Sequence, residues 1–230
     1  MLKNNRFLPT ITTTDKNHFR KLAEVKELGL EEICLFPTTI AYEERKSLYR
    51  ELEKTRVKKI PLVHLREDFK VEEIEYFSIR YQTEIFNTHP AEQSPIPPEW
   101  LKYKKRIYIE NTLYAWDKKE VQNFGGICLD FAHLEDTRRL RREIYQKNLE
   151  IIGRFFCGCG HLSGVNNEKK YSRKFGVEYY SDHLFRDYSD FDFLKKYPKK
   201  YFPEIIALEL ENPIKEQLKL SEYLEKKLNL

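Results

Sequence analysis

Residues 125–136 read GGICLDFAHLED. The apolar run at 127–129 is short and follows two glycines, which is typical of a strand buried in a parallel sheet. The strand ends on a carboxylate, Asp130, and His133 follows three residues later. An apolar strand followed directly by side chains that can bind metals or move protons predicts a strand whose carboxyl end carries function.

Seven other segments share the short, apolar character of this strand. In chain order they are RFLPTITT (6–13), EEICLFPTT (31–39), KKIPLVHLR (58–66), TEIFNTHP (83–90), RIYIENT (106–112), FFCGCGHLSG (155–164) and EIIALELEN (204–212). Between strands, the apolar residues of segments 15–29 and 137–155 recur at helical spacing and predict amphipathic helices. Eight strands that alternate with helices predict a parallel sheet covered by helices.

The number of these units suits one architecture. Eight strand–helix units in 230 residues lie near the lower end of the size range of a (β/α)8 barrel, or TIM barrel. We therefore predict an α/β protein with a single compact TIM-barrel domain over residues 1–230 and a functional site at the carboxyl ends of the strands. Two segments are long for barrel loops: 91–104 is rich in proline, and 162–192 contains no clear strand.

Composition narrows the class of protein. No apolar run is long enough to cross a bilayer, and the first six residues lack the apolar core of a signal peptide, so we expect a cytoplasmic protein without membrane contact. The four cysteines lack the spacing of a zinc ribbon or disulfide scaffold, which predicts reduced, buried thiols. The net charge of +4 is small against 41 basic and 37 acidic residues, so it only mildly favours an anionic partner. The oligomeric state is left open.

Metal-capable side chains end six consecutive strands. They are His64, His89, Glu110, Asp130, His161 and Glu211. A single residue of this kind is more simply explained as structural, because an aspartate after a strand often caps a helix. Six that converge on one rim predict a site for a divalent metal such as zinc or manganese, since a buried carboxylate cluster without a cation would be costly. Of the six histidines, only His18 lies far from these strand ends, and we expect it on the surface.

Strand alternation adds a second prediction, because residues two apart on a strand point to the same side. If His161 points into the barrel, the thiols at 157 and 159 do too, and they fill the interior rather than bind metal. The same alternation puts Glu209 inward beneath Glu211. The last strand therefore offers two candidate ligands, with Glu209 either a partner of Glu211 or the ligand itself.

The residues at these strand ends resemble the xylose isomerase-like barrel superfamily and, within it, most closely the endonuclease IV family (AP endonuclease family 2). The matching motifs are Val63-His64, His89-Pro90, Glu110-Asn111-Thr112, Asp130-Phe131-Ala132-His133, His161-Leu162 and Glu211-Asn212-Pro213. Members of that family hydrolyse the phosphodiester on the 5′ side of an abasic site with a trinuclear zinc cluster. The resemblance implies a metal-dependent DNA-repair hydrolase with two or three Zn²⁺ ions, or Mn²⁺, and no organic cofactor.

The resemblance also implies which residues hold the ions. One ion would be held by His64, His89 and Glu110, a second by Glu110, Asp130, His161 and Glu211, and a third by His133 and His183. Metals bridged in this way lower the pKa of a shared water and neutralise phosphoryl oxygens during an in-line displacement. Glu110, Glu211 and His133 are the residues expected to act in catalysis.

The chain departs from the family's motifs at two places. Ser181-Asp182-His183 has serine where the family has the aspartate of a DxH ligand pair, so the candidate ligand shifts by one residue to Asp182. After His161, the sequence Leu162-Ser163-Gly164 lacks the Asn-Asp of the family motif. The loop residues that family members insert into DNA are not identifiable here, which would weaken DNA binding without touching the metal chemistry.

A sugar or sugar-phosphate isomerase or epimerase of the same superfamily is the alternative function. Such enzymes resemble this chain in four residues around a single divalent metal: Glu110, Asp130, His161 and Glu211. Two of them, Glu110 and Glu211, would flank a small sugar as acid and base. His64 together with His89 favours the hydrolase, because a single-metal isomerase does not require two more imidazoles. A non-enzymatic barrel is the third alternative, and it would retain no metal.

A basic cluster in segment 162–192 is the candidate contact for DNA phosphates. It consists of Lys169, Lys170, Arg173 and Lys174, which follow His161 on the catalytic side. Such contacts are independent of base sequence. If the chain binds DNA, neutralising these four residues should weaken binding and reduce its salt dependence.

Overall fold

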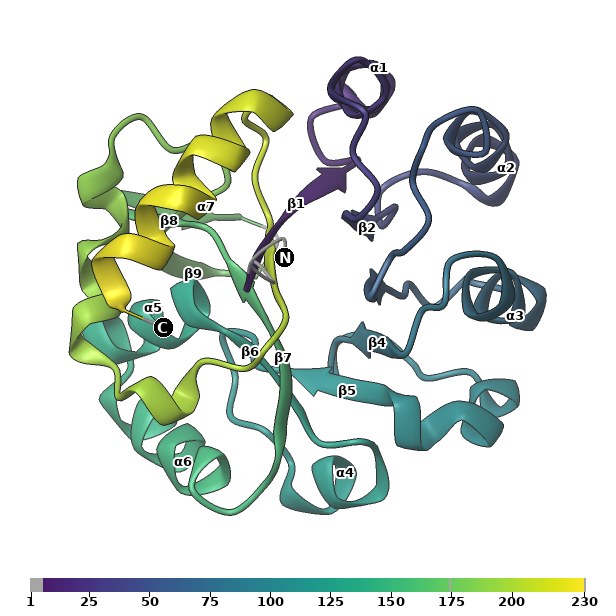
Figure 1. Cartoon of the computed structure of the whole chain (residues 1–230). Helices are drawn as coiled ribbons and strands as arrows, with labels where there is room; N and C mark the ends of the chain where they lie inside the picture. The colour runs from purple at the N-terminus through teal and green to yellow at the C-terminus, as the bar shows by residue number, and fades with distance from the viewer. Residues whose placement is uncertain (1–5, 174, 230) are drawn as a thin grey trace.

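Eight parallel strands close into a barrel in the computed structural model, which describes residues 6–173 and 175–229 (Figure 1). The barrel strands are β1 (Phe7–Thr12), β2 (Cys34–Phe36), β3 (Leu62–His64), β4 (Ile85–Thr88), β5 (Ile107–Glu110), β6 (Ile127–Asp130), β7 (Cys157–Leu162) and β10 (Ile206–Leu208). They follow one another round the barrel in chain order, and β10 pairs with β1 to close it. Each lies within one of the eight predicted segments, which confirms the (β/α)8 barrel.

Helices form a ring outside the barrel (Figure 1). The α-helices are α1 (His18–Leu28), α2 (Tyr42–Leu52), α3 (Val71–Arg80), α4 (Lys118–Asn123), α5 (Phe131–Leu140), α6 (Arg142–Ile152) and α7 (Ile214–Leu228), and the 3-10 helices are η1 (Pro98–Arg106), η2 (Tyr188–Lys196) and η3 (Lys199–Tyr201). Segment 137–155 holds the end of α5 and all of α6 instead of one helix, because Arg141 between them is not helical, with φ −143° and ψ 67°. Within the described residues, no helix is both long and apolar enough to span a bilayer.

The barrel interior is apolar toward its amino end and polar toward its carboxyl end. The buried apolar layer consists of Leu8, Cys34, Phe36, Leu62, Cys128, Cys159 and Ala207. Four members each lie two residues before a polar side chain that alternation turns the same way: Leu62 before His64, Cys128 before Asp130, Cys159 before His161, and Ala207 before Glu209. Cys159 fills the interior, as predicted, and Cys128 lies in the same layer. The prediction that Cys157 also fills the interior is wrong, because this residue is only half-buried and packs against the other core cluster.

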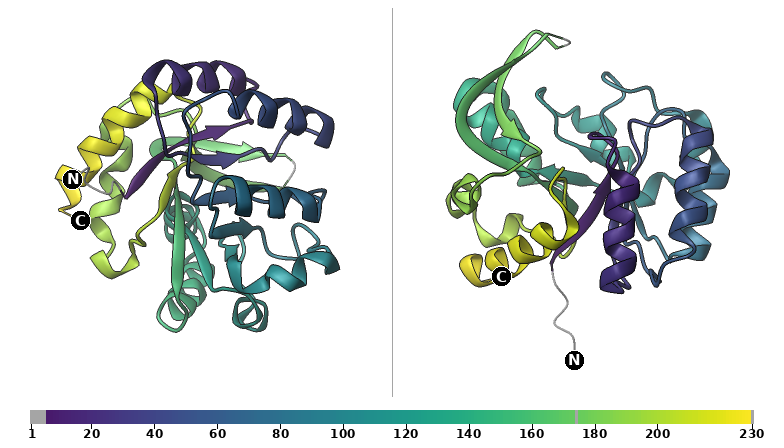
Figure 2. Two further views of the ribbon diagram at one scale, coloured as in Figure 1. Left: turned by 45° about the vertical axis from the view of Figure 1, so that its right-hand side comes forward. Right: turned by 90° about the horizontal axis from the view of Figure 1, so that it is seen from above.

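The long segment 162–192 contains two strands, so the prediction that it holds no strand is wrong. β8 (Gly164–Ser172) and β9 (Val177–Asp182) form an antiparallel hairpin outside the barrel sheet. Figure 2 (right) shows the hairpin projecting beyond the barrel at the carboxyl end of the strands. Most of its residues are exposed or half-buried, so its sequence carries no alternation of apolar and polar residues to identify it as strand.

His18 is buried, which corrects the expectation that it lies on the surface. Its side chain is 2% exposed at the start of α1. The ring centroid lies 4.5 Å from that of Phe19, and Nε2 lies 3.7 Å from Oε1 of Glu44 on α2. The helix was predicted from the spacing of its apolar residues. Histidine is not apolar, so this spacing could not indicate that His18 is buried between two helices.

Candidate metal centre

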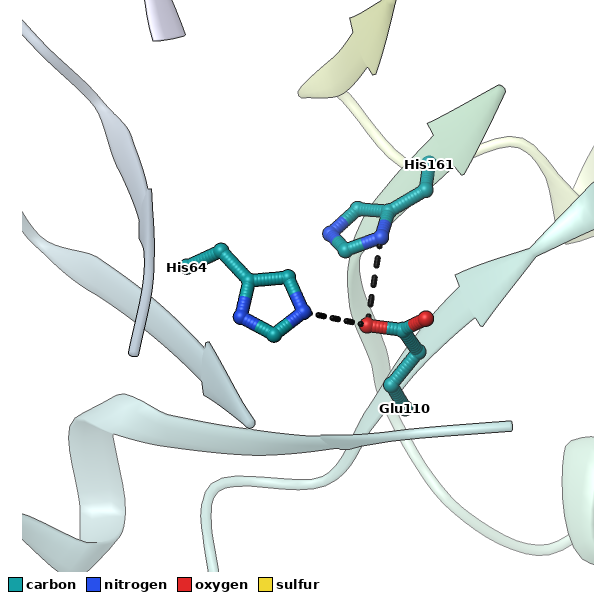
Figure 3. A group of neighbouring side chains, drawn as sticks. All are labelled: His64, Glu110 and His161. Atoms are coloured by element: carbon teal, nitrogen blue, oxygen red, sulfur yellow. Dashed lines mark ion pairs between the residues drawn. The ribbon is translucent and has the colours of Figure 1, made fainter. Parts of the chain in front are cut away.

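Glu110, at the carboxyl end of β5, lies at the centre of the polar layer. Its Oε2 atom is 3.1 Å from Nε2 of His64 on β3 and 3.2 Å from Nδ1 of His161 on β7. Figure 3 shows the two imidazole rings approaching this one oxygen from opposite strands. The amide of Asn87 on β4 donates a hydrogen bond of 2.9 Å to the same oxygen. One carboxylate is therefore fixed by three strands of the barrel.

The side chains around Glu110 keep its carboxylate charged. Its side chain is only 2% exposed, and burial on its own raises the pKa of a carboxyl group. The nearby imidazoles of His161, His64 and His89 outweigh burial and hold the pKa of Glu110 well below its usual range. Glu110 is therefore an anion at neutral pH, as a metal ligand must be.

A second group combines Glu110 with Asp130 and His133. Nδ1 of His133 lies 3.8 Å from Oε1 of Glu110 and 3.6 Å from Oδ2 of Asp130. Burial raises the pKa of Asp130 to about 6, whereas Asp130 and Glu110 together overcome burial and raise the pKa of His133 to about 9. In this arrangement the pKa values favour a proton on the imidazole, and a bound cation would take its place.

The simpler interpretation of Asp130 as a helix cap is also correct. Its Oδ1 atom accepts a hydrogen bond of 2.7 Å from the backbone N–H of His133 in the first turn of α5. Its Oδ2 atom is left facing Nδ1 of His133. The two oxygens therefore serve two purposes, since one caps the helix and the other faces the cluster.

The third group consists of Asp130, His161 and Glu209. Glu209 follows β10, and its Oε2 atom lies 3.4 Å from Nδ1 of His161. Its Oε1 atom lies 4.0 Å from Nδ1 of His183. Burial would raise the pKa of Glu209, but His161 and His183 lower it to about 2. Glu209 is therefore charged at neutral pH and belongs to the same cluster as Glu110.

The carboxylate that enters the cluster from the last strand is Glu209 and not Glu211. Among the described residues, no group of metal-capable atoms includes Glu211. The carboxylate of Glu211 instead interacts electrostatically with Lys21 of α1. Burial lowers the pKa of Lys21, and Glu211 is one of the carboxylates that raise it. Alternation does not separate these two residues, because they are two positions apart. The separation follows from the end of β10 at Leu208: the backbone N–H of Leu210 bonds to the oxygen of Leu208, so the strand does not continue to Glu211.

These three groups have the donor set and spacing of a metal site. The candidate ligand atoms within each group lie within 4.8 Å of one another: His64, Glu110 and His161; Glu110, Asp130 and His133; Asp130, His161 and Glu209. His161 is fully buried, and neither of its ring nitrogens has a hydrogen-bond partner among the described residues. Buried polar atoms are normally paired, so an imidazole of this kind beside two carboxylates fits a divalent cation.

Three further predicted ligands lie at the edge of the cluster or outside it. Nε2 of His89 lies 3.9 Å from Glu110, with its ring 33% exposed, and burial together with His64 lowers its pKa to about 4. The Nδ1 atom of His183 lies 3.0 Å from the backbone oxygen of Glu209. Asp182 is instead engaged by Lys170 at 2.5 Å and by the backbone N–H of Leu184. Neither His89 nor His183 belongs to a ligand group found among the described residues, and Asp182 belongs to the hairpin.

Sequence reasoning assigned no role to two asparagines that position the ligands. Asn87 holds Glu110, and Asn111 is bonded to both backbone groups of Asp130, at 2.7 Å and 2.8 Å. Both are fully buried. Parity is a usable signal for Asn87, which lies two residues before His89, but not for Asn111, which directly follows Glu110.

The basic cluster lies on the hairpin that projects beyond the barrel. Lys169 pairs with Glu178 at 3.1 Å and Lys170 with Asp182 at 2.5 Å, so both lysines are already neutralised locally. Arg173, at the tip, is exposed, and no ion pair is found for it within residues 6–173 and 175–229. Lys174, the fourth predicted phosphate contact, lies outside the described residues.

Comparison with solved structures found the crystal structure of an AP endonuclease, family 2, from Brucella melitensis. It is 8% identical to this chain with a TM-score of 0.43, and the match covers 93% of this chain and 96% of that one. The sequence matches no protein-family model, and no curated protein was found as a relative. A likeness of this size says nothing about function, which depends on the residues of the site.

Proposed function

We propose that the protein is a divalent-metal-dependent hydrolase that cleaves a phosphodiester. The observation that carries this proposal is the position of Glu110, which belongs to two of the three ligand groups. A carboxylate shared in this way suits two cations held side by side, as in metal-assisted phosphoryl chemistry. We propose zinc as the metal, with manganese as the alternative, because imidazole and carboxylate ligands suit both.

Each residue has a separate part in this proposal. His64, Glu110 and His161 would hold one ion, and Asp130 and His133 would share Glu110 with a second. Glu209 and the edge histidines, His89 and His183, would complete the coordination at the mouth. When bound, such ions lower the pKa of water and neutralise phosphoryl oxygens.

Protons set the condition for metal binding in this site. At neutral pH the free site holds a protonated His133, whose pKa is raised to about 9, and a protonated His161, whose pKa Glu110 raises well above its usual range. Both imidazoles must lose their protons to become ligands. The buried carboxylates that raise the pKa values of these imidazoles would bind the cations in the loaded site.

We further propose DNA with an abasic site as the substrate. The hairpin at the carboxyl end of the barrel supports this, because Arg173 is exposed at its tip. A cation there can contact backbone phosphates whatever the base sequence. The neutralised lysines at 169 and 170 would contribute less, since each already has a carboxylate partner.

A sugar or sugar-phosphate isomerase or epimerase with a single metal is the second candidate. One observation favours it: a polar cavity of about 340 Å³ opens directly beside His64 and His89. A cavity of this size accommodates a small sugar but not a duplex. In that case Glu110 and Glu209 would serve as acid and base across the substrate carbon.

Metal analysis and cleavage of an abasic duplex test the proposal together. We expect two or more zinc or manganese ions per chain in protein purified without chelator, and nicking of the duplex that is lost in His89→Ala. One ion per chain without nicking, but with exchange of a sugar proton into solvent, would establish the isomerase instead. A protein that retains no metal would exclude both enzymes.

A further inference from the structure

A cavity of about 820 Å³ lies at the amino end of the barrel, at the other end from the candidate metal centre. Its lining comes from the starts of β4, β5, β7 and β10 and from the segments that lead into these strands, which follow one another on one side of the barrel together with β6. None of the residues proposed above to bind metal or substrate lines it. The metal centre therefore does not explain this surface.

The floor of this amino-end cavity is apolar and only partly covered. Ile85, Tyr108 and Ile205 pack against the buried layer of the barrel interior, yet each is only half-buried. The ring of Tyr108 lies directly against Gly158, where a Cβ atom would come within 2.2 Å of it, so only glycine leaves room for the ring. Beside it, Phe156 is 69% exposed, and its ring centroid lies 6.4 Å from that of Tyr108. An exposed phenylalanine over an apolar hollow is a surface that a partner would cover favourably.

The rim of the cavity carries exposed charges of both signs. They are the carboxylates and ammonium groups of Glu84, Glu204, Lys105 and Lys200. Within residues 6–173 and 175–229, no ion pair is found for any of these four, and Lys105 donates only to the backbone oxygen of Phe124, at 3.5 Å. Arg106 adds a third cation, whose guanidinium donates to the backbone oxygens of Thr83 and Glu84. The rim therefore offers both positive and negative groups that have no ionic partner.

A second copy of this chain matches such a rim better than a ligand of a single sign. An anionic ligand would bring like charge against the two carboxylates, and a cationic ligand would do the same at the lysines. In a contact related by a two-fold axis, each face meets the same face turned round, so the ammonium groups of one copy can lie against the carboxylates of the other. The charges of this rim are therefore complementary to themselves.

The size of the face also suits a protein partner. Fifteen residues line the cavity, and a standard protein–protein interface has about 20–30 residues on each side. The cavity and its immediate surroundings thus reach the size of such an interface. An aromatic residue at its centre and charges at its rim follow the usual arrangement of an apolar core and a polar edge.

From these features we infer that the amino end of the barrel is the interface of a symmetric homodimer, in which Phe156 of each copy enters the cavity of the other. This inference goes beyond the proposed function and does not depend on it. The hairpin and the metal centre lie at the carboxyl end of the strands (Figure 2, right), so the contact leaves both sites of the dimer open.

Analytical ultracentrifugation of the full chain over a range of concentrations tests the interface. We expect wild type to sediment with twice the mass of one chain and to dissociate on dilution. Phe156→Ser should raise the dissociation constant about tenfold or more, as for the loss of a central interface residue. The matched control is Tyr171→Ser on β8, which removes a 62% exposed aromatic ring at the other end of the barrel and should dimerise like wild type.

Two charge-reversed double variants test the choice of partner. The rim is acidic in Lys105→Glu/Lys200→Glu and basic in Glu84→Lys/Glu204→Lys, so each variant alone should be monomeric because like charges would meet. An equimolar mixture of the two should associate again, since the faces are then complementary. The melting temperature and the metal content of each variant show that the fold is kept.

Two results would overturn the inference. One is a wild type that stays monomeric at every concentration, and an apolar small molecule released from that protein on denaturation would then assign the cavity to a ligand. The other is a dimer whose dissociation constant is unchanged in Phe156→Ser and in both charge-reversed variants, because that dimer would use another face.

Discussion

Nδ1 of His161 lies 3.2 Å from Oε2 of Glu110, yet the imidazole forms no hydrogen bond through either ring nitrogen among the described residues. A buried donor beside a buried carboxylate would normally be aligned with it, because the unpaired state is costly. Burial opposes a charge on His161, but Glu110 raises its pKa, so a proton can serve this pair in the free site, and a shared cation would satisfy both groups in the loaded one. The metal content of the purified protein is therefore the first property to measure.

Glu110→Gln should remove metal from the cluster. The amide keeps the shape of the side chain but removes the charge that two ligand groups share. We expect the metal content, measured by mass spectrometry of acid-digested protein, to fall by at least one ion per chain. Glu31→Gln is the control, because Glu31 is 59% exposed and pairs only with Lys58 in the described structure. Full metal content in Glu110→Gln would contradict the shared-ligand arrangement.

Glu209→Gln and Glu211→Gln form a matched pair two residues apart. Glu209 lies 3.4 Å from His161 and belongs to a ligand group, whereas Glu211 belongs to none among the described residues. We therefore expect Glu209→Gln to weaken metal binding about tenfold or more, and Glu211→Gln to bind metal like wild type. Competition with a coloured chelator measures both affinities. The reverse ranking would return the ligand role to the Glu-Asn-Pro motif.

The sequence predicted most of the barrel because its strands are buried on both faces and end on polar residues. Each apolar run maps onto one barrel strand, and the polar residue after the run lies on the rim. Alternation also predicted that Glu209 and Cys159 point inward. What decided between Glu209 and Glu211 was the end of β10 at Leu208, which is a property of strand pairing and not of either residue.

Other parts of the molecule could not be predicted because their signals are absent from a single sequence. The hairpin of β8 and β9 is solvated on most of its surface, so apolar alternation is missing. Arg66 follows a strand as an ordinary charged residue, and only the fold brings it to the cavity beside His64 that Phe175, more than a hundred residues later, also lines. Residues from several loops line such a cavity, so no pattern within one stretch of sequence predicts it.

The salt dependence of DNA binding should show which basic side chains of the hairpin contact phosphates. Arg173 is exposed at the tip, whereas Lys169 is paired with Glu178 at 3.1 Å. If the chain binds DNA, Arg173→Gln should lower the slope of log affinity against log salt by about 1, the value for one phosphate contact. Lys169→Gln is the comparison and should change the slope less. Equal slopes in wild type and Arg173→Gln, measured by fluorescence anisotropy, would exclude this arginine as a phosphate contact.

His18 should make the stability of the protein fall as the pH decreases. Burial lowers the pKa of His18, although Glu44 and Asp15 act in the opposite direction and Lys21 adds to the lowering. The unfolded chain therefore takes up a proton first, so the contribution of His18 is fully present above a pH of about 6.5 and is lost below it. For one group, the slope of the unfolding free energy cannot exceed about 1.4 kcal/mol per pH unit.

Urea unfolding between pH 7.5 and 5 measures this contribution as a difference between wild type and His18→Phe, in which the ring at position 18 no longer titrates. We expect the free energy of unfolding of wild type to fall more steeply with decreasing pH than that of His18→Phe. Glu44→Gln should steepen the slope further, because it removes a carboxylate 3.7 Å from Nε2 that raises the pKa of His18. Since the site histidines titrate equally in all three proteins, parallel curves would mean that His18 is solvated in the folded protein.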